Sequence, residues 1–237
     1  MIRIALHGAG RMAEAVLRSA ASQDDIEICA VIAPHSPKWD VHLSYLSGLE
    51  HLTDYPDVLV DFSLPDGTAE AADWCGKTGV ALLSGVTGLH ELARNNLAQA
   101  AKSAAVLWSP NMSIGINLLA RLCAEVARHV PVARPILVED VHHQWKVDAP
   151  SGTALMLGET IQQARPQAAA PIAYTSERTG EVIGEHKVTF EFPGEQLTLT
   201  HVAENRDIFA SGSLAAARWL NDQTPGNYTA MDWLGGS

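Results

Sequence analysis

Short apolar runs alternate with helical segments through the first 110 residues, and this alternation restricts the fold more than any other feature of the chain. After the first run, Ala13, Val16 and Ala20 recur at helical spacing, and residues 89–103 are helical in composition. The apolar runs cover residues 2–6, 26–32, 58–62, 80–83 and 106–108. Such compact runs are typical of strands buried on both faces. The pattern predicts an α/β fold with a Rossmann-like, doubly wound parallel sheet.

The pattern changes after residue 112. A helix with Ile114, Leu118 and Leu122 on one face leads to a predicted strand at 136–141, and a second helix follows with Ala154 and Leu157 on one stripe. Residues 188–192 and 197–200 then alternate apolar and polar side chains, which predicts an antiparallel hairpin. A second domain of the α+β kind is expected at 113–205. Residues 212–234 return to helical composition, so 1–112 and 206–237 together should form the dinucleotide-binding domain.

Charge and composition exclude several classes of protein. The formal net charge of −11 argues against nucleic acid as a partner, because phosphate contacts need clustered lysine and arginine. No apolar run is long enough to span a bilayer, and the first residues lack the features of a signal peptide, so a cytoplasmic location is expected. The three cysteines are far apart and not in a metal-binding spacing. No metal site is predicted.

A glycine turn lies between the first strand and the first helix. Glycines allow the backbone to approach a pyrophosphate, and the following helix N-terminus favours its negative charge. The predicted cofactor-binding residues of this turn are Gly8, Ala9, Gly10, Arg11 and Met12. The alternative is a tight strand-to-helix turn that binds nothing.

The loop after the second strand bears on the choice of cofactor. NAD-preferring folds place an acidic residue there to bind the ribose 2′-hydroxyl. This chain instead has His35, Ser36 and Lys38, which suit a 2′-phosphate. The loop therefore favours NADPH over NADH, the alternative being a solvated loop that contacts nothing.

Two further loops follow predicted strands. In an open α/β sheet, ligands gather at the carboxyl ends of the strands. The residues predicted to line the nicotinamide ribose are Gly85, Val86 and Thr87 in one loop and Ser109, Pro110, Asn111 and Met112 in the other. Loops rich in Gly, Ser and Asn are also common as ordinary turns.

Residues 139–153 hold the densest set of chemically active groups. His142, His143 and Lys146 supply groups that can move protons near neutral pH. The backbone amides of Ser151, Gly152 and Thr153, at a predicted helix start, can bind a carboxylate. If the strand ran through both histidines, their side chains would face opposite sides. Either the strand ends between them, or one histidine is structural.

Five motifs, which occur along the chain in the order found in the family, resemble the dihydrodipicolinate reductase family of bacterial lysine and diaminopimelate biosynthesis. The most specific is the run from His142 to Thr153, HHQWKVDAPSGT. The other four are VDFS from Val60, GVTG from Gly85, NMSIG from Asn111 and IGEH from Ile183. The resemblance covers nearly the whole chain.

The resemblance implies an NAD(P)H-dependent reductase that converts 4-hydroxy-tetrahydrodipicolinate, a small dicarboxylate, to tetrahydrodipicolinate by hydride transfer. It implies that His142 is the proton donor or acceptor and Lys146 the second proton donor. His143, Gly152 and Thr153 would bind the substrate carboxylates. It also implies a homotetramer formed through the sheet of the second domain.

The chain departs from the family pattern at several positions. The family turn has the form GxxGxxG, whereas this chain has His7 and Ala13 at the outer positions. Val86, Met112 and Trp145 replace residues that are often Thr, Phe and His. Two other functions therefore stay open. One is a related dehydrogenase acting on another small carboxylated imine or aldehyde, and the other is a non-catalytic nucleotide-binding relative.

Overall fold

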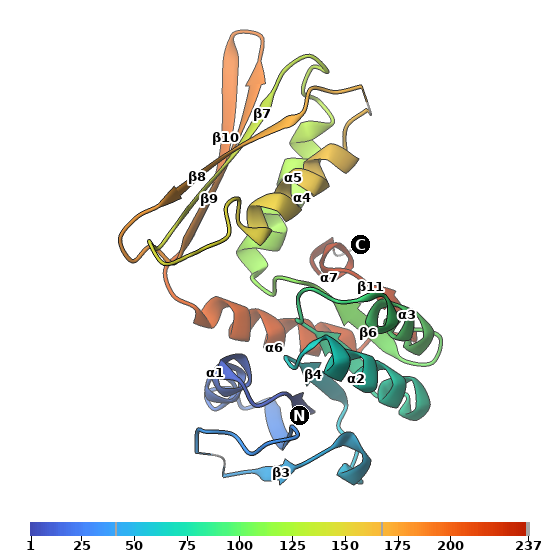
Figure 1. The fold of residues 1–237 in the computed structure, drawn as a ribbon. Coiled ribbons are helices and arrows are strands. Elements are labelled where there is room, and N and C mark those ends of the chain that lie inside the picture. Colours follow the sequence, from blue (N-terminus) through green and yellow to red (C-terminus); the bar gives the residue numbers. More distant parts are fainter. Residues whose placement is uncertain (41, 167, 236–237) are drawn as a thin grey trace. The chain divides into compact units, whose positions relative to one another are not determined.

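The computed structural model describes residues 1–40, 42–166 and 168–235. The chain forms two compact units (Figure 1). The first comprises Met1–Ser113 and Asp207–Ser237, and the second comprises Ile114–Arg206. Within the described ranges, no helix has the length and apolar character needed to cross a membrane.

The first unit is built on a seven-stranded sheet in which every pair of neighbouring strands is parallel. The strand order is β11-β6-β5-β4-β1-β2-β3. The bounds are β1 Ile2–His7, β2 Ile26–Ile32, β3 Ser44–Leu46, β4 Val58–Asp61, β5 Ala81–Ser84, β6 Ala105–Trp108 and β11 Gly226–Tyr228. The order reverses between β1 and β4, and this reversal is where open α/β sheets bind ligands. The predicted doubly wound parallel sheet is confirmed.

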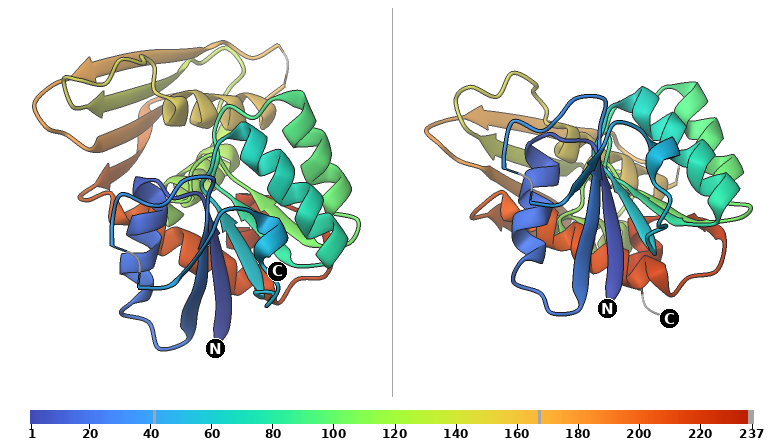
Figure 2. Two further views of the ribbon diagram at one scale, coloured as in Figure 1. Left: turned by 60° about the horizontal axis from the view of Figure 1, so that its bottom comes forward. Right: turned by 90° about the horizontal axis from the view of Figure 1, so that it is seen from below.

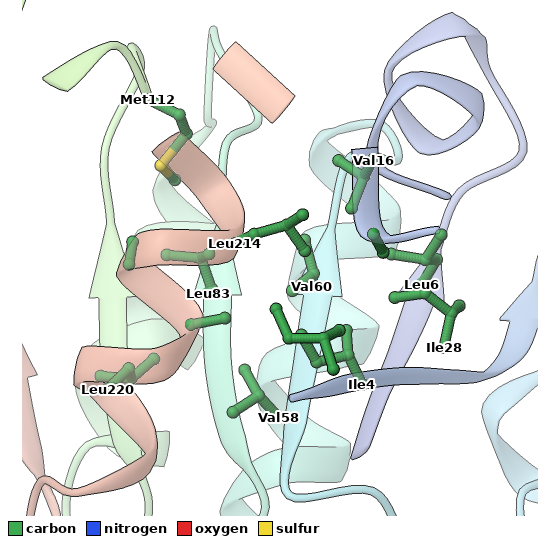
Figure 3. Packing of buried hydrophobic residues seen from close by; sticks show 14 of the residues in the cluster. Ile4, Leu6, Val16, Ile28, Val58, Val60, Leu83, Met112, Leu214 and Leu220 are labelled. Carbon is green, nitrogen blue, oxygen red and sulfur yellow. The ribbon is translucent and has the colours of Figure 1, made fainter. Parts of the chain in front are cut away.

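Helices cover both faces of this sheet (Figure 2). Successive strand residues face opposite sides, so Ile4 and Leu6 pack in one cluster while Ala5 packs in another. The first cluster includes Val16 of α1 (Arg11–Ala20) and Leu214 of α6 (Asp207–Asn221), as Figure 3 shows. The second includes residues of α2 (Pro65–Thr78) and α3 (Glu91–Ala100). Two short elements, η1 (Leu49–His51) and α7 (Ala230–Gly235), complete the unit.

The second unit is a four-stranded mixed sheet in the order β10-β9-β7-β8. Its strands are β7 Ile136–His142, β8 Ile172–Arg178, β9 Gly184–Phe192 and β10 Glu195–Ala203. The predicted hairpin is confirmed as β9 and β10, joined through Pro193 and Gly194 with Gly194 at φ +83°. Two helices, α4 (Ile114–Ala127) and α5 (Gly152–Gln163), pack on the sheet. The unit has the expected α+β character.

The C-terminal segment differs from the prediction. The sequence predicts helical structure in residues 212–234, but α6 begins earlier, at Asp207, and the strand β11 separates it from α7. The strand is only three residues long and pairs with β6 at the edge of the sheet. Its structure comes from that pairing, because three residues carry no periodicity of their own.

Candidate functional site

The glycine turn has the tight geometry that the sequence predicts. Gly8 adopts φ +103°, a conformation that favours glycine, and an added Cβ would lie 2.6 Å from the carbonyl oxygen of Phe62. The amide of Gly8 donates to the carbonyl of Ile32. The turn is therefore fixed between β2 and the segment after β4, directly before α1.

The start of α1 is open to a ligand. Gly10 is the N-cap residue and provides no side-chain cap, and an added Cβ there would meet no atom within 4 Å. The first helical amides therefore have open space in front of them, at the positive end of the helix dipole. A pyrophosphate fits this arrangement.

Two hollows adjoin the turn. A pocket of about 880 Å³ is lined by Gly8, Ala9 and Gly10, together with residues that follow β2, β3 and β4. A groove of about 580 Å³ lies between Arg11 and the loop after β2, and His35, Ser36 and Lys38 line it. The structure thus places the three residues predicted to meet a 2′-phosphate beside the glycine turn.

A third, smaller hollow of about 230 Å³ gathers other predicted cofactor residues. Its lining includes Met12, Gly85, Val86 and Thr87. An added Cβ on Gly85 would lie 2.3 Å from the ring of Phe62, which also lines the hollow. Glycine at this position lets the two loops approach each other closely.

The loop after β6 is ordered by its own side chains. Ser109 is buried, and its hydroxyl donates to the carbonyl of Asn111 at 2.7 Å. Pro110 is exposed, whereas the Met112 side chain is 2% exposed and belongs to the first apolar cluster. Met112 is therefore part of the core, and it lines none of the hollows described above.

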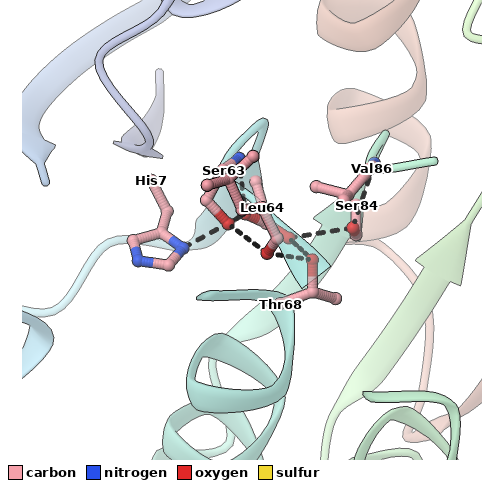
Figure 4. Close-up of polar contacts among 7 residues, drawn as sticks. His7, Ser63, Leu64, Thr68, Ser84 and Val86 are labelled. Atoms are coloured by element: carbon pink, nitrogen blue, oxygen red, sulfur yellow. Dashed lines mark hydrogen bonds and ion pairs between the residues drawn. The ribbon is translucent and has the colours of Figure 1, made fainter. Parts of the chain in front are cut away.

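A buried carboxylate, Asp61, lies beside the glycine turn, and Figure 4 shows His7, Ser63, Thr68 and Ser84, the residues that bond it. Asp61 ends β4, is fully buried and accepts hydrogen bonds from four residues. The donors are His7 Nδ1 at 3.1 Å, the amide and hydroxyl of Ser63 at 3.0 and 2.5 Å, Thr68 Oγ1 at 2.7 Å and Ser84 Oγ at 2.9 Å. Burial raises the pKa of Asp61, but these hydrogen bonds outweigh it and hold that pKa below its ordinary value.

The second unit holds a histidine and a carboxylate in a similar pairing. His142 Nδ1 lies 2.9 Å from Asp140 Oδ2, two residues earlier on β7, and both side chains are buried. Arg178 Nη1 is 3.0 Å from the same oxygen, and Ser176 Oγ donates to Asp140 Oδ1 at 2.6 Å. Burial raises the pKa of Asp140, but Ser176 and Arg178 lower it below its ordinary value overall.

The ionised Asp140 fixes the histidine tautomer. Because a carboxylate only accepts, His142 Nδ1 carries the proton and Nε2 is the nitrogen left for chemistry. Burial lowers the pKa of His142, and Asp140 opposes this effect. Asp140 was not among the predicted site residues, although its i−2 spacing on a strand places it on the same face as His142.

The two histidines have different environments, because β7 ends at His142. His143 follows the strand and lies against Trp145, with ring centroids 5.9 Å apart. The first of the two alternatives left open by the sequence therefore holds: the strand ends between the histidines. His143 Nδ1 is buried and has no hydrogen-bond partner in the described part of the chain.

Lys146 lies next to the start of α5. Its ammonium is 2.8 Å from Asp148 Oδ1, and its side chain is 24% exposed. Lys146, with a smaller contribution from the backbone of Gly152, lowers the pKa of Asp148. Ser151 caps the helix, and its Oγ accepts from the amide of Ala154 at 3.1 Å. The predicted lysine and the predicted helix start thus act together on one carboxylate within this chain.

Two more histidines, neither of them predicted as a site residue, lie near His142, although His186 is the last residue of the IGEH motif. The ring of His186 on β9 is 5.2 Å from that of His142, and the ring of His201 on β10 is 6.3 Å from that of His186. Burial lowers the pKa of His186 to about 4. Ser151 Oγ lies 3.4 Å from His186 Nε2, so His186 connects His142 with the cap of α5.

The first unit has the architecture of dinucleotide-dependent oxidoreductases: a doubly wound sheet with an open helix N-terminus after a glycine turn. The comparisons with known proteins identify the family. The sequence pattern of "Dihydrodipicolinate reductase, N-terminus" matches residues 2–112, and that of "Dihydrodipicolinate reductase, C-terminus" matches residues 115–234. The chain belongs to the dihydrodipicolinate reductase family.

Individual relatives agree with this assignment. The chain is 40% identical to a 4-hydroxy-tetrahydrodipicolinate reductase of Xanthomonas campestris pv. campestris (strain B100), covering 98% of this chain and 97% of the relative. It is 34% identical to the Nitrosomonas europaea enzyme of the same name, covering 99% and 98%. A solved structure, dipicolinate-bound dihydrodipicolinate reductase from Paenisporosarcina sp. TG-14, has the same fold, with a TM-score of 0.85, 24% identity and 98% coverage of both chains.

Proposed function

We propose that this protein is an NAD(P)H-dependent 4-hydroxy-tetrahydrodipicolinate reductase, which forms tetrahydrodipicolinate. The observation that carries the proposal is the arrangement of buried His142, held by Asp140, together with Lys146 at the start of α5. This arrangement lies within a chain of the dihydrodipicolinate reductase family. A reduced nicotinamide, when bound, supplies the hydride.

His142 is proposed as the group that manages a proton. Hydride addition at one carbon of a C=C–C=N system requires a proton elsewhere, and Nε2 of His142 is the nitrogen available to carry it. Burial lowers the pKa of His142, so the ring is mainly neutral at neutral pH in the free protein. A bound dianion would raise this pKa again, because nearby negative charge favours the imidazolium. Substrate binding itself would therefore promote protonation of the donor.

Lys146 and the start of α5 are proposed as the carboxylate site, with His143 at its edge. Asp148 supports this, since its carboxylate already bonds Lys146 and interacts with the Gly152 backbone. The two groups therefore suit a carboxylate. An added Cβ on Gly152 would meet no atom within 4 Å, so there is open space in front of the helix start. A substrate carboxylate would replace Asp148 there.

We propose NADPH as the preferred nucleotide. The groove between Arg11 and the loop after β2 gathers Arg11, His35 and Lys38, with Glu14 as its one carboxylate in the described lining. A 2′-phosphate gains from this local positive charge. Lys38→Ala should weaken NADPH binding about tenfold and leave NADH binding nearly unchanged, as measured by titration of nicotinamide fluorescence. Equal losses for both nucleotides would contradict the preference.

The test of activity follows nicotinamide absorbance. The purified protein, with NADPH or NADH, is given the product that dihydrodipicolinate synthase forms from pyruvate and aspartate semialdehyde. Rapid oxidation of the nucleotide is expected, faster with NADPH at low concentration. Intact nucleotide binding without oxidation would instead favour another carboxylated substrate or a non-catalytic relative.

We also propose that the open face of the four-stranded sheet forms a homotetramer. Side chains of β7, β9 and β10 that alternate with the helix-facing ones lie on this face, among them Val202, which is 54% exposed. Glu139 and Lys187 pair across it at 2.8 Å. Light scattering after size exclusion should give four times the chain mass, and Val202→Glu should lower it. A wild-type monomer would contradict the proposal.

A further inference from the structure

We propose that His7 is a nucleotide-binding residue whose Nε2 contacts the adenosine half of the dinucleotide, with Asp61 orienting the ring. The inference rests on the proposed function, because it takes the pocket at the glycine turn as the dinucleotide site. His7 is the last residue of β1, where the sheet presents the turn. His7 also replaces the first glycine of the family turn.

Asp61 fixes both the direction and the tautomer of the ring. Its carboxylate is ionised at neutral pH, because the hydrogen bonds that it accepts hold its pKa below the ordinary value against the effect of burial. An ionised carboxylate accepts only, so Nδ1 of His7 is the donor in the 3.1 Å contact. In the neutral ring, Nε2 then carries a lone pair and accepts hydrogen bonds.

Nε2 is available to a ligand. It makes no hydrogen bond with any residue that the structure describes, and the ring is turned so that its second nitrogen points away from the carboxylate cluster (Figure 4). The side chain is 6% exposed, and His7 lines the pocket of about 880 Å³. The exposed part of this otherwise buried side chain therefore faces the pocket at the turn.

Gly67, in the first turn of α2, leaves space for this arrangement. An added Cβ would lie 3.2 Å from His7 Cε1 and 2.5 Å from Ser63 Oγ. A larger residue would have to displace the imidazole or the serine that shares its carboxylate. The ring is thus held by Asp61 on one side and by the start of α2 on another.

The charges around the pocket indicate which part of the nucleotide His7 meets. The charged side chains in its described lining are all carboxylates: Glu50, Asp66, Glu70 and Asp73. Such walls disfavour a phosphate but accept the uncharged part of the adenosine, whose ribose 3′-hydroxyl can donate to Nε2. The pocket also has apolar walls, Ile32, Leu49 and Trp74, that suit the base. The phosphates belong instead at the start of α1 and in the groove lined by Arg11 and Lys38.

Two substitutions separate the role of each nitrogen. The amide nitrogen of asparagine can take the place of Nδ1, so His7→Asn keeps the bond to Asp61 and removes the atom that faces the pocket. The amide of glutamine can take the place of Nε2, so His7→Gln keeps a polar atom at the pocket. Ser84→Ala is the matched control, because it removes a different hydrogen bond to Asp61, at 2.9 Å, from a fully buried residue.

Affinity for ADP-ribose and for NADPH is measured by isothermal titration calorimetry, together with thermal unfolding. His7→Asn should weaken both ligands about 3- to 10-fold, the loss typical of one hydrogen bond, at a midpoint close to that of the wild type. His7→Gln and Ser84→Ala should bind both ligands within about twofold of the wild type. Unchanged binding by His7→Asn, or an equal loss in Ser84→Ala, would overturn the proposal. A wild-type protein that binds neither ligand would refute the proposed function itself, and this inference with it.

Discussion

The two histidine–carboxylate pairs of this protein have similar geometry and different surroundings. His7 meets Asp61 at 3.1 Å and His142 meets Asp140 at 2.9 Å, each through Nδ1 and each with a fully or almost fully buried carboxylate. The other donors to Asp61 are three hydroxyl groups and the backbone amide of Ser63, whereas Asp140 also pairs with a guanidinium. The first pair lies at the glycine turn, where we propose that it orients a nucleotide-binding nitrogen. The second lies in a group of ionisable side chains that includes Lys146, Arg178 and two further histidines, and shifted pKa values of this kind are common at catalytic sites.

The largest expected effect is on turnover, when a residue of the second unit is changed. Lys146→Ala should lower turnover by about 10²- to 10⁴-fold, because it removes a proposed proton donor and carboxylate ligand, and should leave nucleotide affinity nearly unchanged. Steady-state kinetics and nucleotide titration check both halves. Lys102→Ala, which changes an exposed lysine bonded to Gln99, is the control. Near-normal turnover would remove Lys146 from the mechanism.

The two carboxylates should differ in what they contribute to stability. Asp140→Asn leaves Arg178, whose side chain is 16% exposed, without its counter-charge and should lower the free energy of unfolding by about 3 kcal/mol. Asp61→Asn should cost about 1 kcal/mol, because the hydroxyls of Thr68 and Ser84 can rotate to accept from the new amide. Urea unfolding of both variants tests the order. Equal losses would show that Arg178 adds nothing.

Acid should destabilise the protein through its histidine cluster. The pKa of His186 is about 4 in the folded chain and 6.5 ordinarily. Between pH 4 and pH 6.5 the unfolded state therefore binds a proton at this histidine that the folded state does not bind. Stability should therefore fall as pH drops from about 6.5 to 4, by about 3 kcal/mol from this group. His186→Gln should flatten the pH dependence of urea unfolding in this window. His129→Gln, at a side chain 72% exposed, should not.

The smallest expected effect is on ligand affinity, when alanine replaces glycine at the start of α1 or of α5. Gly10→Ala should weaken nucleotide binding about tenfold and spare dipicolinate, and Gly152→Ala should do the reverse, because each added Cβ enters space that is now open. Both proteins should fold, since neither Cβ meets an atom within 4 Å. Calorimetric titration with each ligand checks the pattern. Loss of both ligands in either variant would contradict separate sites.

Local signals account for the parts of the fold that were predicted. The apolar pattern is clear in residues 26–32 and in the hairpin of β9 and β10. Both segments form the strands that the pattern predicts. β8 was not predicted, because none of its residues is buried and it lies at an edge of the sheet. α2 was not predicted either, because two glycines, Gly67 and Gly76, lower the helix propensity of its sequence. The helix is stabilised by packing in the second apolar cluster.

For the site, the sequence by itself determined the local pieces. Each of these pieces is a single short segment of the chain: the glycine turn, the run from His142 to Lys146 and the helix start at Ser151. Their backbone conformations are set by residues next to them in the sequence. Only the tertiary structure decided which buried groups became partners. His7 and Asp61 are 54 residues apart, and Asp140 and Ser176 are 36 apart. A buried carboxylate takes its donors from the strands that lie beside it, and strand order is a property of the whole sheet.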